Sequence, residues 1–135
     1  MSEATSGSVQ WSIAPYFLVH DVVSSASYYR DILGFRFDRF WGDPPSFCMV
    51  KRAGIVIMLA QVEPAIPLRP NNLASREGGA WDAYMWVDDV DALHSGLVSR
   101  GASVARELCD QPYGCRGFDV LDPNGYRLCF GQATS

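Results

Sequence analysis

Residues 17–35 read FLVHDVVSSASYYRDILGF, and this stretch decides the first half of the fold. The apolar, partly β-branched residues before Asp21 predict a strand over residues 13–19. Asp21 is a favourable N-cap residue, and apolar side chains recur after it at helical spacing until Gly34, a residue typical of helix ends. The residues with this spacing are Val22, Ala26, Tyr29 and Leu33. The stretch therefore predicts a strand followed by an amphipathic helix.

The same pattern recurs in the second half of the chain. The matching positions are Val19-His20-Asp21-Val22 and Val87-Asp88-Asp89-Val90 at an offset of 68, Gly34 and Gly101 at 67, and residues 54–59 and 125–130 at 71. Asp89 is the expected N-cap of a second helix, which Gly101 would end. The chain is therefore predicted to consist of two modules of one kind.

For each module the sequence predicts one strand, one helix and three further strands. The further strands are expected at residues 35–41, 47–50 and 55–59 in the first module. In the second module the first strand is expected at 83–87 and the further strands at 104–108, 117–121 and 126–130. One module alone would leave a sheet face bare, so two are expected to pack together. The predicted fold class is α+β, with two tandem βαβββ modules forming a curved mixed sheet around a cavity. We expect a flexible N-terminus over residues 1–10 and one domain over 11–132, made of a module at 11–63, a linker at 64–80 and a module at 81–132.

The composition excludes several classes of protein. Apolar residues make up 48% and charged residues 19% of the 135 residues, which favours a packed core over disorder. The net charge of -4 and the lack of a basic stripe argue against a nucleic-acid partner. No apolar run approaches the roughly 18–20 residues that span a bilayer, and the first ten residues are polar, so we expect a cytoplasmic protein without a membrane partner. The four cysteines are too irregularly spaced for a zinc or redox motif.

Four motifs together resemble a known superfamily. They are Phe17-Leu18-Val19-His20-Asp21-Val22, Tyr28-Tyr29-Arg30-Asp31-Ile32-Leu33-Gly34-Phe35, Val87-Asp88-Asp89-Val90-Asp91 and Asp122-Pro123-Asn124-Gly125-Tyr126. In order and spacing, over about residues 12–132, the chain resembles the vicinal oxygen chelate superfamily, which includes glyoxalase I, extradiol dioxygenases and bleomycin resistance proteins. The resemblance implies the fold predicted above, but it leaves the chemistry open because this scaffold carries many functions.

The resemblance also implies where metal ligands would lie. The four corresponding positions are Ala14, Met58, Asp82 and Cys129. Ala14 has no ligand atom and Met58 offers only a thioether, so two candidates remain where three or more are needed. We therefore expect no metal and no cofactor. His20 is interpreted as a surface or capping residue beside its helix and His94 as a solvated helix residue, so no catalytic residue is nominated.

The face around these positions is expected to be an aromatic binding surface. The candidate ligand-binding residues are Phe40, Trp41, Phe47, Met58, Asp82, Tyr84, Trp86, Tyr113, Phe118, Arg127 and Cys129. Aromatic rings at this density can stack on planar ligand groups. Asp82 and the acidic composition favour a cationic ligand, whereas Arg127 argues mildly against one.

Three hypotheses for function follow. The leading one is a metal-free, homodimeric binding protein of the bleomycin-resistance type, which would sequester a planar or hydrophobic small molecule. The alternative is a metal-dependent glyoxalase- or dioxygenase-like lyase or isomerase with a noncanonical site at Asp82 and Cys129. The third is a partner-binding or vestigial domain whose cavity is filled, with Trp86 and Tyr84 packed against each other.

Overall fold

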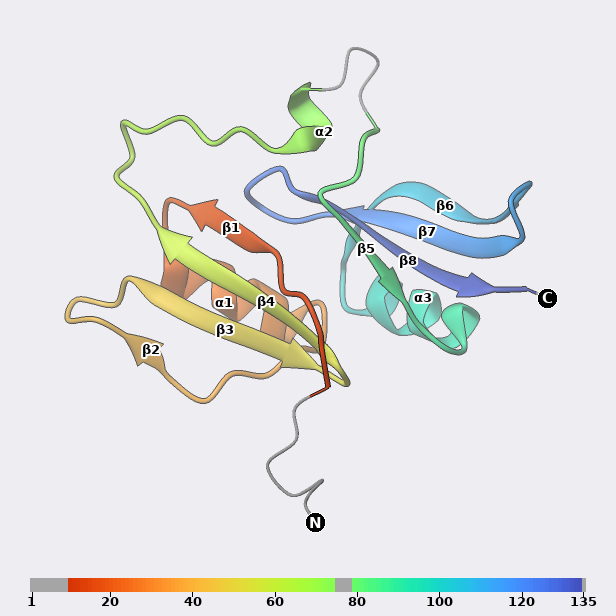
Figure 1. Ribbon diagram of the computed structural model, residues 1–135, viewed down its shortest axis with the longest axis horizontal. Helices are drawn as coiled ribbons and strands as arrows, with labels where there is room; N and C mark the ends of the chain where they lie inside the picture. The colour runs from red at the N-terminus through yellow and green to blue at the C-terminus, as the bar shows by residue number, and fades with distance from the viewer. Residues whose placement is uncertain (1–9, 75–78, 135) are drawn as a thin grey trace.

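The computed structural model describes residues 10–74 and 79–134, and it contains the predicted repeat of elements (Figure 1). The first module comprises β1 (Tyr16–Val19), α1 (Val22–Asp31), β2 (Phe40–Trp41), β3 (Phe47–Arg52) and β4 (Ile55–Gln61). The second comprises β5 (Ala83–Trp86), α3 (Val90–Ser99), β6 (Ser103–Gln111), β7 (Cys115–Leu121) and β8 (Arg127–Ala133). A short helix, α2 (Asn71–Ala74), lies between them. The α+β class and the two βαβββ modules are thus confirmed.

The eight strands form two four-stranded mixed sheets that lie side by side. Their strand orders are β1-β4-β3-β2 and β5-β8-β7-β6, so the second sheet repeats the topology of the first. β1 runs parallel to β4 and β5 runs parallel to β8, whereas the other neighbouring strands are antiparallel. Tyr16 pairs with Met58, and Tyr84 pairs with Cys129. These equivalent pairs differ by the offsets of 68 and 71 that the sequence repeat predicts.

The two long helices begin and end where the sequence predicts. The Asp21 carboxylate accepts a hydrogen bond from Ser24 N (3.1 Å) at the start of α1. Asp89 does the same for Ala92 N (3.3 Å) at the start of α3, although its own φ is +43°. Gly34 and Gly101 follow the helices with φ of +74° and +91°, in the left-handed region that glycine tolerates best.

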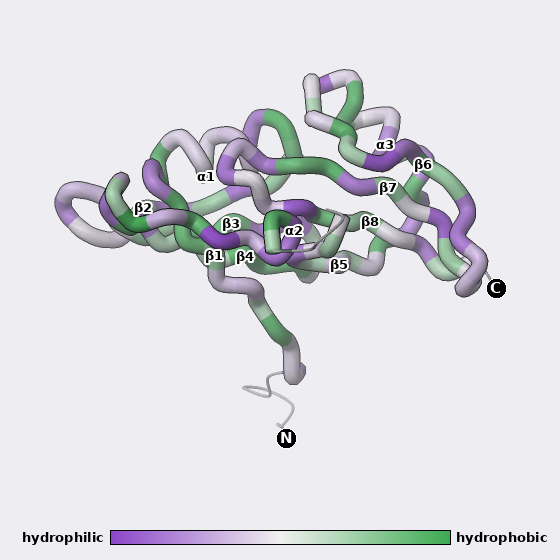
Figure 2. The backbone as a smooth tube through the Cα atoms, turned by 90° about the horizontal axis from the view of Figure 1, so that it is seen from above, coloured by the Kyte–Doolittle hydropathy of each residue, from purple (hydrophilic) through white to green (hydrophobic). Residues whose placement is uncertain are grey.

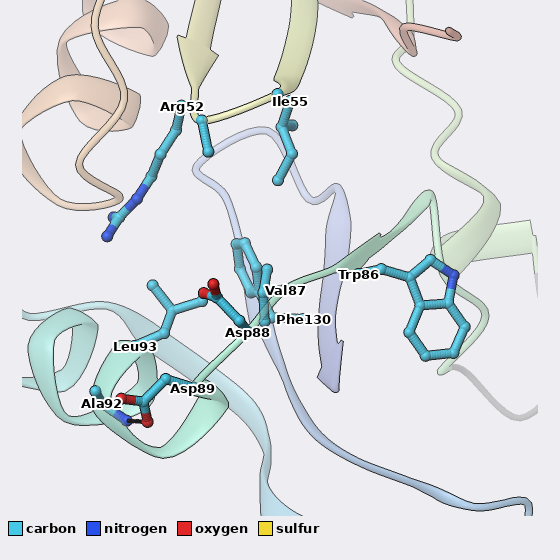
Figure 3. A pocket seen from close by; sticks show the side chains of 11 residues that line it. Arg52, Ile55, Trp86, Val87, Asp88, Asp89, Ala92, Leu93 and Phe130 are labelled. Atoms are coloured by element: carbon cyan, nitrogen blue, oxygen red, sulfur yellow. Dashed lines mark hydrogen bonds between the residues drawn. The ribbon is translucent and has the colours of Figure 1, made fainter. Parts of the chain in front are cut away.

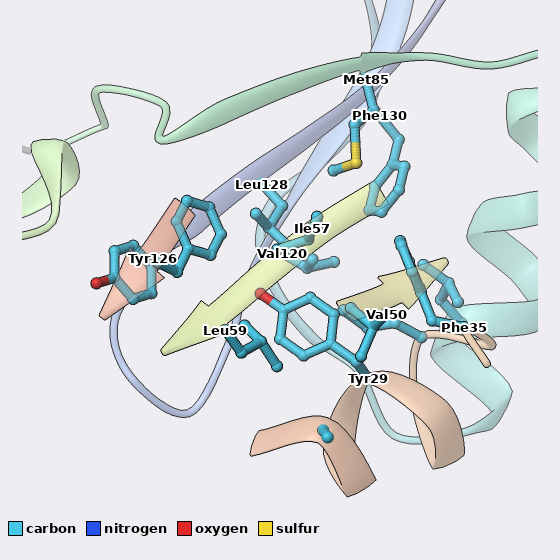
Figure 4. Close-up of a cluster of buried hydrophobic side chains, with 14 of the residues drawn as sticks. Tyr29, Phe35, Val50, Ile57, Leu59, Met85, Val120, Tyr126, Leu128 and Phe130 are labelled. Atoms are coloured by element: carbon cyan, nitrogen blue, oxygen red, sulfur yellow. The ribbon is translucent and has the colours of Figure 1, made fainter. Parts of the chain in front are cut away.

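Both modules contribute to one hydrophobic core, which lies between the sheets and the helices (Figure 4). Tyr29 of α1 packs edge-on against Phe35, and Phe118 stacks on Phe130. The Tyr29 hydroxyl also donates to the buried Asp122 carboxylate (2.7 Å) of the second module. Since the core and this hydrogen bond cross the module boundary, the modules form one packed unit.

The structure corrects three local predictions. The strand predicted at residues 35–41 is reduced to β2, with one additional bridge between Arg36 and Lys51. The linker contains α2, which was not predicted. His94 is not a solvated helix residue, because its ring packs edge-on against Phe118 (centroids 4.9 Å apart) and contacts the Glu107 carboxylate. Residues 1–9 of the predicted flexible N-terminus and residues 75–78 of the linker lie outside the described residues. Within the described ranges, no helix is long and apolar enough to cross a membrane.

Candidate ligand-binding site

Among the described residues, the face of both sheets opposite α1 and α3 carries no helical layer, and we call it the open face. Figure 2 shows α1 and α3 on the same side of the strands. Along β1 the side chains alternate accordingly: Phe17 is buried towards the helices, whereas Tyr16 on the open face is 59% exposed. The candidate site therefore consists of the side chains that the strands direct away from the helices.

Three aromatic residues form a ladder on the open face of the second sheet. The Trp81 and Tyr84 rings lie 4.8 Å apart between centroids at an interplanar angle of 70°. Tyr84 and Trp86 also lie 4.8 Å apart, at 52°. Tyr84 and Trp86 share a face because side chains two apart on a strand point the same way. The Trp86 indole is 63% exposed, so one end of the ladder is open to solvent.

A second aromatic group lies on the open face of the first sheet. Tyr16 and Phe47 lie 6.2 Å apart between ring centroids. Trp41, which pairs with Phe47 across β2 and β3, carries the guanidinium of Arg39 over its ring at 3.9 Å. Met49 and Trp41 also help to line a shallow hollow of about 180 Å³. Planar groups could therefore be contacted on either sheet.

A buried carboxylate organises the polar centre of the second sheet. Asp119 is only 1% exposed and accepts hydrogen bonds from Arg106 Nη2 (2.9 Å), Arg127 Nε (2.8 Å) and Trp81 Nε1 (3.1 Å). Burial alone would raise the pKa of Asp119, but the hydrogen bonds from the two arginines outweigh it and lower that pKa. Asp119 is thus an ionised anchor that fixes two guanidinium groups and the first ring of the ladder.

Small residues and thiols lie beneath the middle of the ladder. The Tyr84 hydroxyl lies 2.8 Å from Cys115 Sγ. A Cβ atom at Gly131 would clash with that hydroxyl, so glycine is required where the phenol rests on β8. Burial raises the pKa of Tyr84, and the contact with Cys115 adds to the shift. The Tyr84 phenol is therefore a neutral packing partner of the Cys115 side chain.

The donor set at the four implied metal positions does not fit a metal ion. Ala14 has no donor atom. Both carboxylate oxygens of Asp82 already accept backbone hydrogen bonds, from Asn71 N and from Arg127 N (2.8 Å). Burial raises the pKa of Cys129 to about 12, so a metal ion would have to displace a tightly held proton from this thiol. Met58 contributes only a thioether.

The structure places most of the predicted ligand-binding residues on the open face but moves two of them to the core. Phe118 is fully buried between α3 and Phe130, and Phe40 packs against Phe37 (5.0 Å between centroids) on the helix side. Both side chains point to the face that the helices cover, because each lies one residue away along its strand from a side chain on the open face, so neither can contact a ligand there. The side chains directed to the open face are those of Trp41, Phe47 and Met58 on the first sheet, and of Tyr84, Trp86, Arg127 and Cys129 on the second. Cys129 is nevertheless fully buried, so it is not accessible to a ligand as predicted. Tyr113 is exposed at the β6–β7 turn, next to Cys115.

Several members of the site were not predicted. Trp81 precedes β5, so strand alternation did not assign it to this face. Arg106 reaches Asp119 because β6 shifts its register on both sides of Arg106, which strand parity cannot foresee. Asp119 itself could have been found, since it shares parity with Gly117 on β7 and pairs with Cys129.

Comparison with solved structures shows the same fold in other proteins. TioX from Micromonospora sp. ML1 is 20% identical with a TM-score of 0.71, covering 92% of this chain and 99% of that one. A glyoxalase-related enzyme from Clostridium phytofermentans is 17% identical with a TM-score of 0.71, covering 94% and 98%. TnmS3, an antibiotic binding protein from Streptomyces sp. CB03234, is 22% identical with a TM-score of 0.63, covering 93% and 99%. These identities establish similarity of fold only.

The sequence itself identifies the family. No curated protein sequence matches the chain. However, the profile of the Glyoxalase/Bleomycin resistance protein/Dioxygenase superfamily matches residues 13–130, which is nearly the whole chain. The strand order of both sheets agrees with this match. The chain therefore belongs to the glyoxalase/bleomycin resistance protein/dioxygenase superfamily.

Proposed function

We propose that this chain binds a planar, largely hydrophobic small molecule on its open face, without a metal ion and without changing the bound molecule. The observation that carries the proposal is the ladder of Trp81, Tyr84 and Trp86 on the sheet face opposite α1 and α3. Aromatic side chains offer planar groups large contact areas at little cost in side-chain entropy.

The charges around the ladder favour a ligand with little net charge. Arg106 and Arg127 face Asp119, and the Asp82 carboxylate is already occupied by backbone donors. The formal charges of these four side chains cancel. The attraction of Asp82 for a cation, expected from the sequence, is therefore weakened, and stacking supplies most of the affinity.

The similarities to other proteins support binding but also suggest the alternative of catalysis. TnmS3 is described as an antibiotic binding protein, whereas another similar structure is a glyoxalase-related enzyme. Metal-dependent lyase or isomerase chemistry would need three or more ligands, whereas Ala14 has no donor side chain, Met58 offers only a thioether and the Asp82 carboxylate already accepts two backbone hydrogen bonds. The donor chemistry thus favours binding.

The filled-cavity hypothesis is partly reflected in the geometry. Tyr84 and Trp86 do pack against each other, as that hypothesis requires. Trp86 is nevertheless 63% exposed, so much of its surface remains available to a ligand. We therefore retain small-molecule binding as the better reading.

A homodimer would complete this site. Tyr16, Trp86 and Tyr113 are each more than half exposed at or beside the open face, and such apolar surface is typical of an interface. A twofold-related copy could cover these side chains and enclose the ligand between two open faces. Sedimentation equilibrium would then give the mass of a dimer, and a monomer at all concentrations would contradict this part of the proposal.

A thermal-shift screen tests the binding function. The protein would be heated with planar antibiotics and aromatic metabolites, in parallel with EDTA and with added zinc or manganese. A planar compound should raise the melting temperature equally in all conditions, because a ligand that binds the folded state stabilises it. Stabilisation that requires the metal would instead support the enzyme alternative, and no stabilisation by any planar compound would oppose both.

A further inference from the structure

A cavity of about 650 Å³ lies between the two modules, where the β3–β4 turn meets the end of β5 and the start of α3 (Figure 3). Ile55 reaches it from the first module, and Val87, Leu93 and Phe130 line it from the second. Figure 3 shows the Trp86 indole, which forms its rim, directed away from Leu93 and Asp88. The cavity thus adjoins the aromatic ladder, with which it shares Trp86 at its rim, but its other lining residues do not belong to the ladder.

The internal repeat explains why this space is empty. At the equivalent junction, the β7–β8 turn meets the end of β1, and Tyr126 stacks on Phe17 with 4.0 Å between centroids. The Tyr126 hydroxyl also donates to Leu18 O (2.6 Å). By the offsets of 71 and 68, Ile55 replaces Tyr126 and Met85 replaces Phe17. The ring stack and the hydroxyl that close one junction are thus missing from the other.

Two further contacts are lost in the same way. Asn124 donates to Ser25 Oγ (3.1 Å) across the closed junction, and Leu73 of α2 packs beside Gly125. The offset of 71 places Gly54 at the position of Gly125. A Cβ atom at Gly54 would meet nothing within 4 Å in the described part of the chain. The cavity therefore follows from specific differences between the two repeats.

The lining combines an apolar interior with a net negative mouth. Phe130 is almost completely buried and forms part of the apolar wall. Arg52 Nη1 is committed to Leu33 O (2.7 Å), and the Asp89 carboxylate caps α3. Asp88 is exposed and makes no hydrogen bond or ion pair with any residue that the structure describes. Two carboxylates against one guanidinium leave a negative charge at the mouth.

We propose that this cavity is a second binding site, for a small molecule with a hydrophobic body and one protonated amine. The body would contact Ile55, Leu93 and Phe130, and the ammonium group would pair with Asp88. A volume of about 650 Å³ lies within the range of about 300–1,000 Å³ that is typical of small-molecule sites. The open face lacks such an available carboxylate, since Asp82 and Asp119 already accept hydrogen bonds there.

Titration of ¹⁵N-labelled protein with 4-phenylbutylamine tests the proposal. The amide signals of Gly54, Ala92 and Leu93 should shift in a saturable way. The Asp88→Asn variant should bind about three- to fivefold more weakly, which is the scale of one solvent-accessible ion pair. The uncharged 4-phenyl-1-butanol should bind the native protein more weakly than the amine does, by a similar factor. Ala92→Trp should abolish the shifts by filling the cavity.

Matched controls separate this site from general effects and from the open face. Asp110→Asn and Ala105→Trp change exposed residues of β6 outside the cavity and should leave amine binding unchanged. Trp81→Ala should weaken the binding of a ligand on the open face but leave the binding of the amine unchanged. Equal affinity for amine and alcohol, unchanged binding to Ala92→Trp, or loss of amine binding in Trp81→Ala would overturn the proposal.

Discussion

Trp86 is the residue on which ligand binding at the open face should depend most. Its indole is the exposed end of the aromatic ladder, in contact with Tyr84 but uncovered on its other side. Trp86→Ala should therefore weaken binding of a planar ligand by about 1–3 kcal/mol, the scale of a lost aromatic anchor. Calorimetric titration with a compound from the thermal-shift screen measures the loss. Trp11→Ala removes a fully exposed indole elsewhere in the chain and serves as the control; equal losses in both variants would contradict the assignment.

Asp119 should matter for stability and for its dependence on pH. Asp119→Asn leaves Arg106 and Arg127 beside a neutral amide, and breaking a buried pair of this kind costs about 3 kcal/mol. The pKa of Asp119 is lowered in the folded state, so its contribution is present above the unfolded-state pKa of about 3.9 and is lost as the pH falls through the folded pKa. Urea unfolding should show the variant's deficit shrinking below about pH 4. A deficit that stays constant on acidification would argue that Asp119 is not ionised in the native protein.

At the scale of elements, the two helix caps are chemically alike but conformationally different. Asp21 has an extended φ of −143°, whereas Asp89 has a left-handed φ of +43°. Asp21→Ala should cost about 1 kcal/mol of unfolding free energy through the lost cap. Asp89→Ala should cost about 2 kcal/mol, because alanine also tolerates the left-handed region poorly. Asp89→Gly should restore most of this loss, and urea midpoints at constant m-value would measure all three. Equal losses in the two alanine variants would exclude a conformational contribution at Asp89.

The elements that could be predicted are those whose signals are local. The caps of α1 and α3 and the glycines after them act within one helical turn, so the sequence locates both helices. β2 is shorter than its alternating pattern predicts, because a strand extends only where a partner pairs with it. α2 begins at Asn71, whose amide bonds to Asp82 eleven residues later, and no local pattern encodes that contact.

The site could be predicted in part for the same reason. Tyr84 and Trp86 share parity on one strand, so alternation alone assigns them to one face. The predictions that Phe40 and Phe118 bind ligand were wrong, because a position beside a turn or a strand does not determine which face of the sheet a side chain occupies. The register does: Phe40 pairs with the buried Cys48, and Phe118 pairs with the buried Phe130. Arg106 depends on a bulge, which pairing between β6 and β7 creates.

At the scale of the whole molecule, the two repeats are joined more tightly than a linker requires. Their shared core and the bond between Tyr29 and Asp122 place residues 93 positions apart in direct contact. The two modules share one topology but differ at their junctions: one junction is closed by Tyr126, and the other retains a cavity. The differences between the repeats thus account for the two separate surfaces that we propose as binding sites.

This coupling predicts that both modules unfold together. Tyr29→Phe removes the hydroxyl that donates to Asp122 (2.7 Å) and leaves a buried acceptor with one donor fewer, at a cost of about 1–3 kcal/mol. Amide signals from β3 and from β7 should lose intensity at the same urea concentration, and the variant should shift both midpoints equally. Tyr28→Phe is the matched control, since the Tyr28 hydroxyl makes a longer, partly exposed bond to Leu121 O (3.3 Å) and its loss should shift both midpoints less. A shift confined to the first module would mean that the modules are independent despite their shared core.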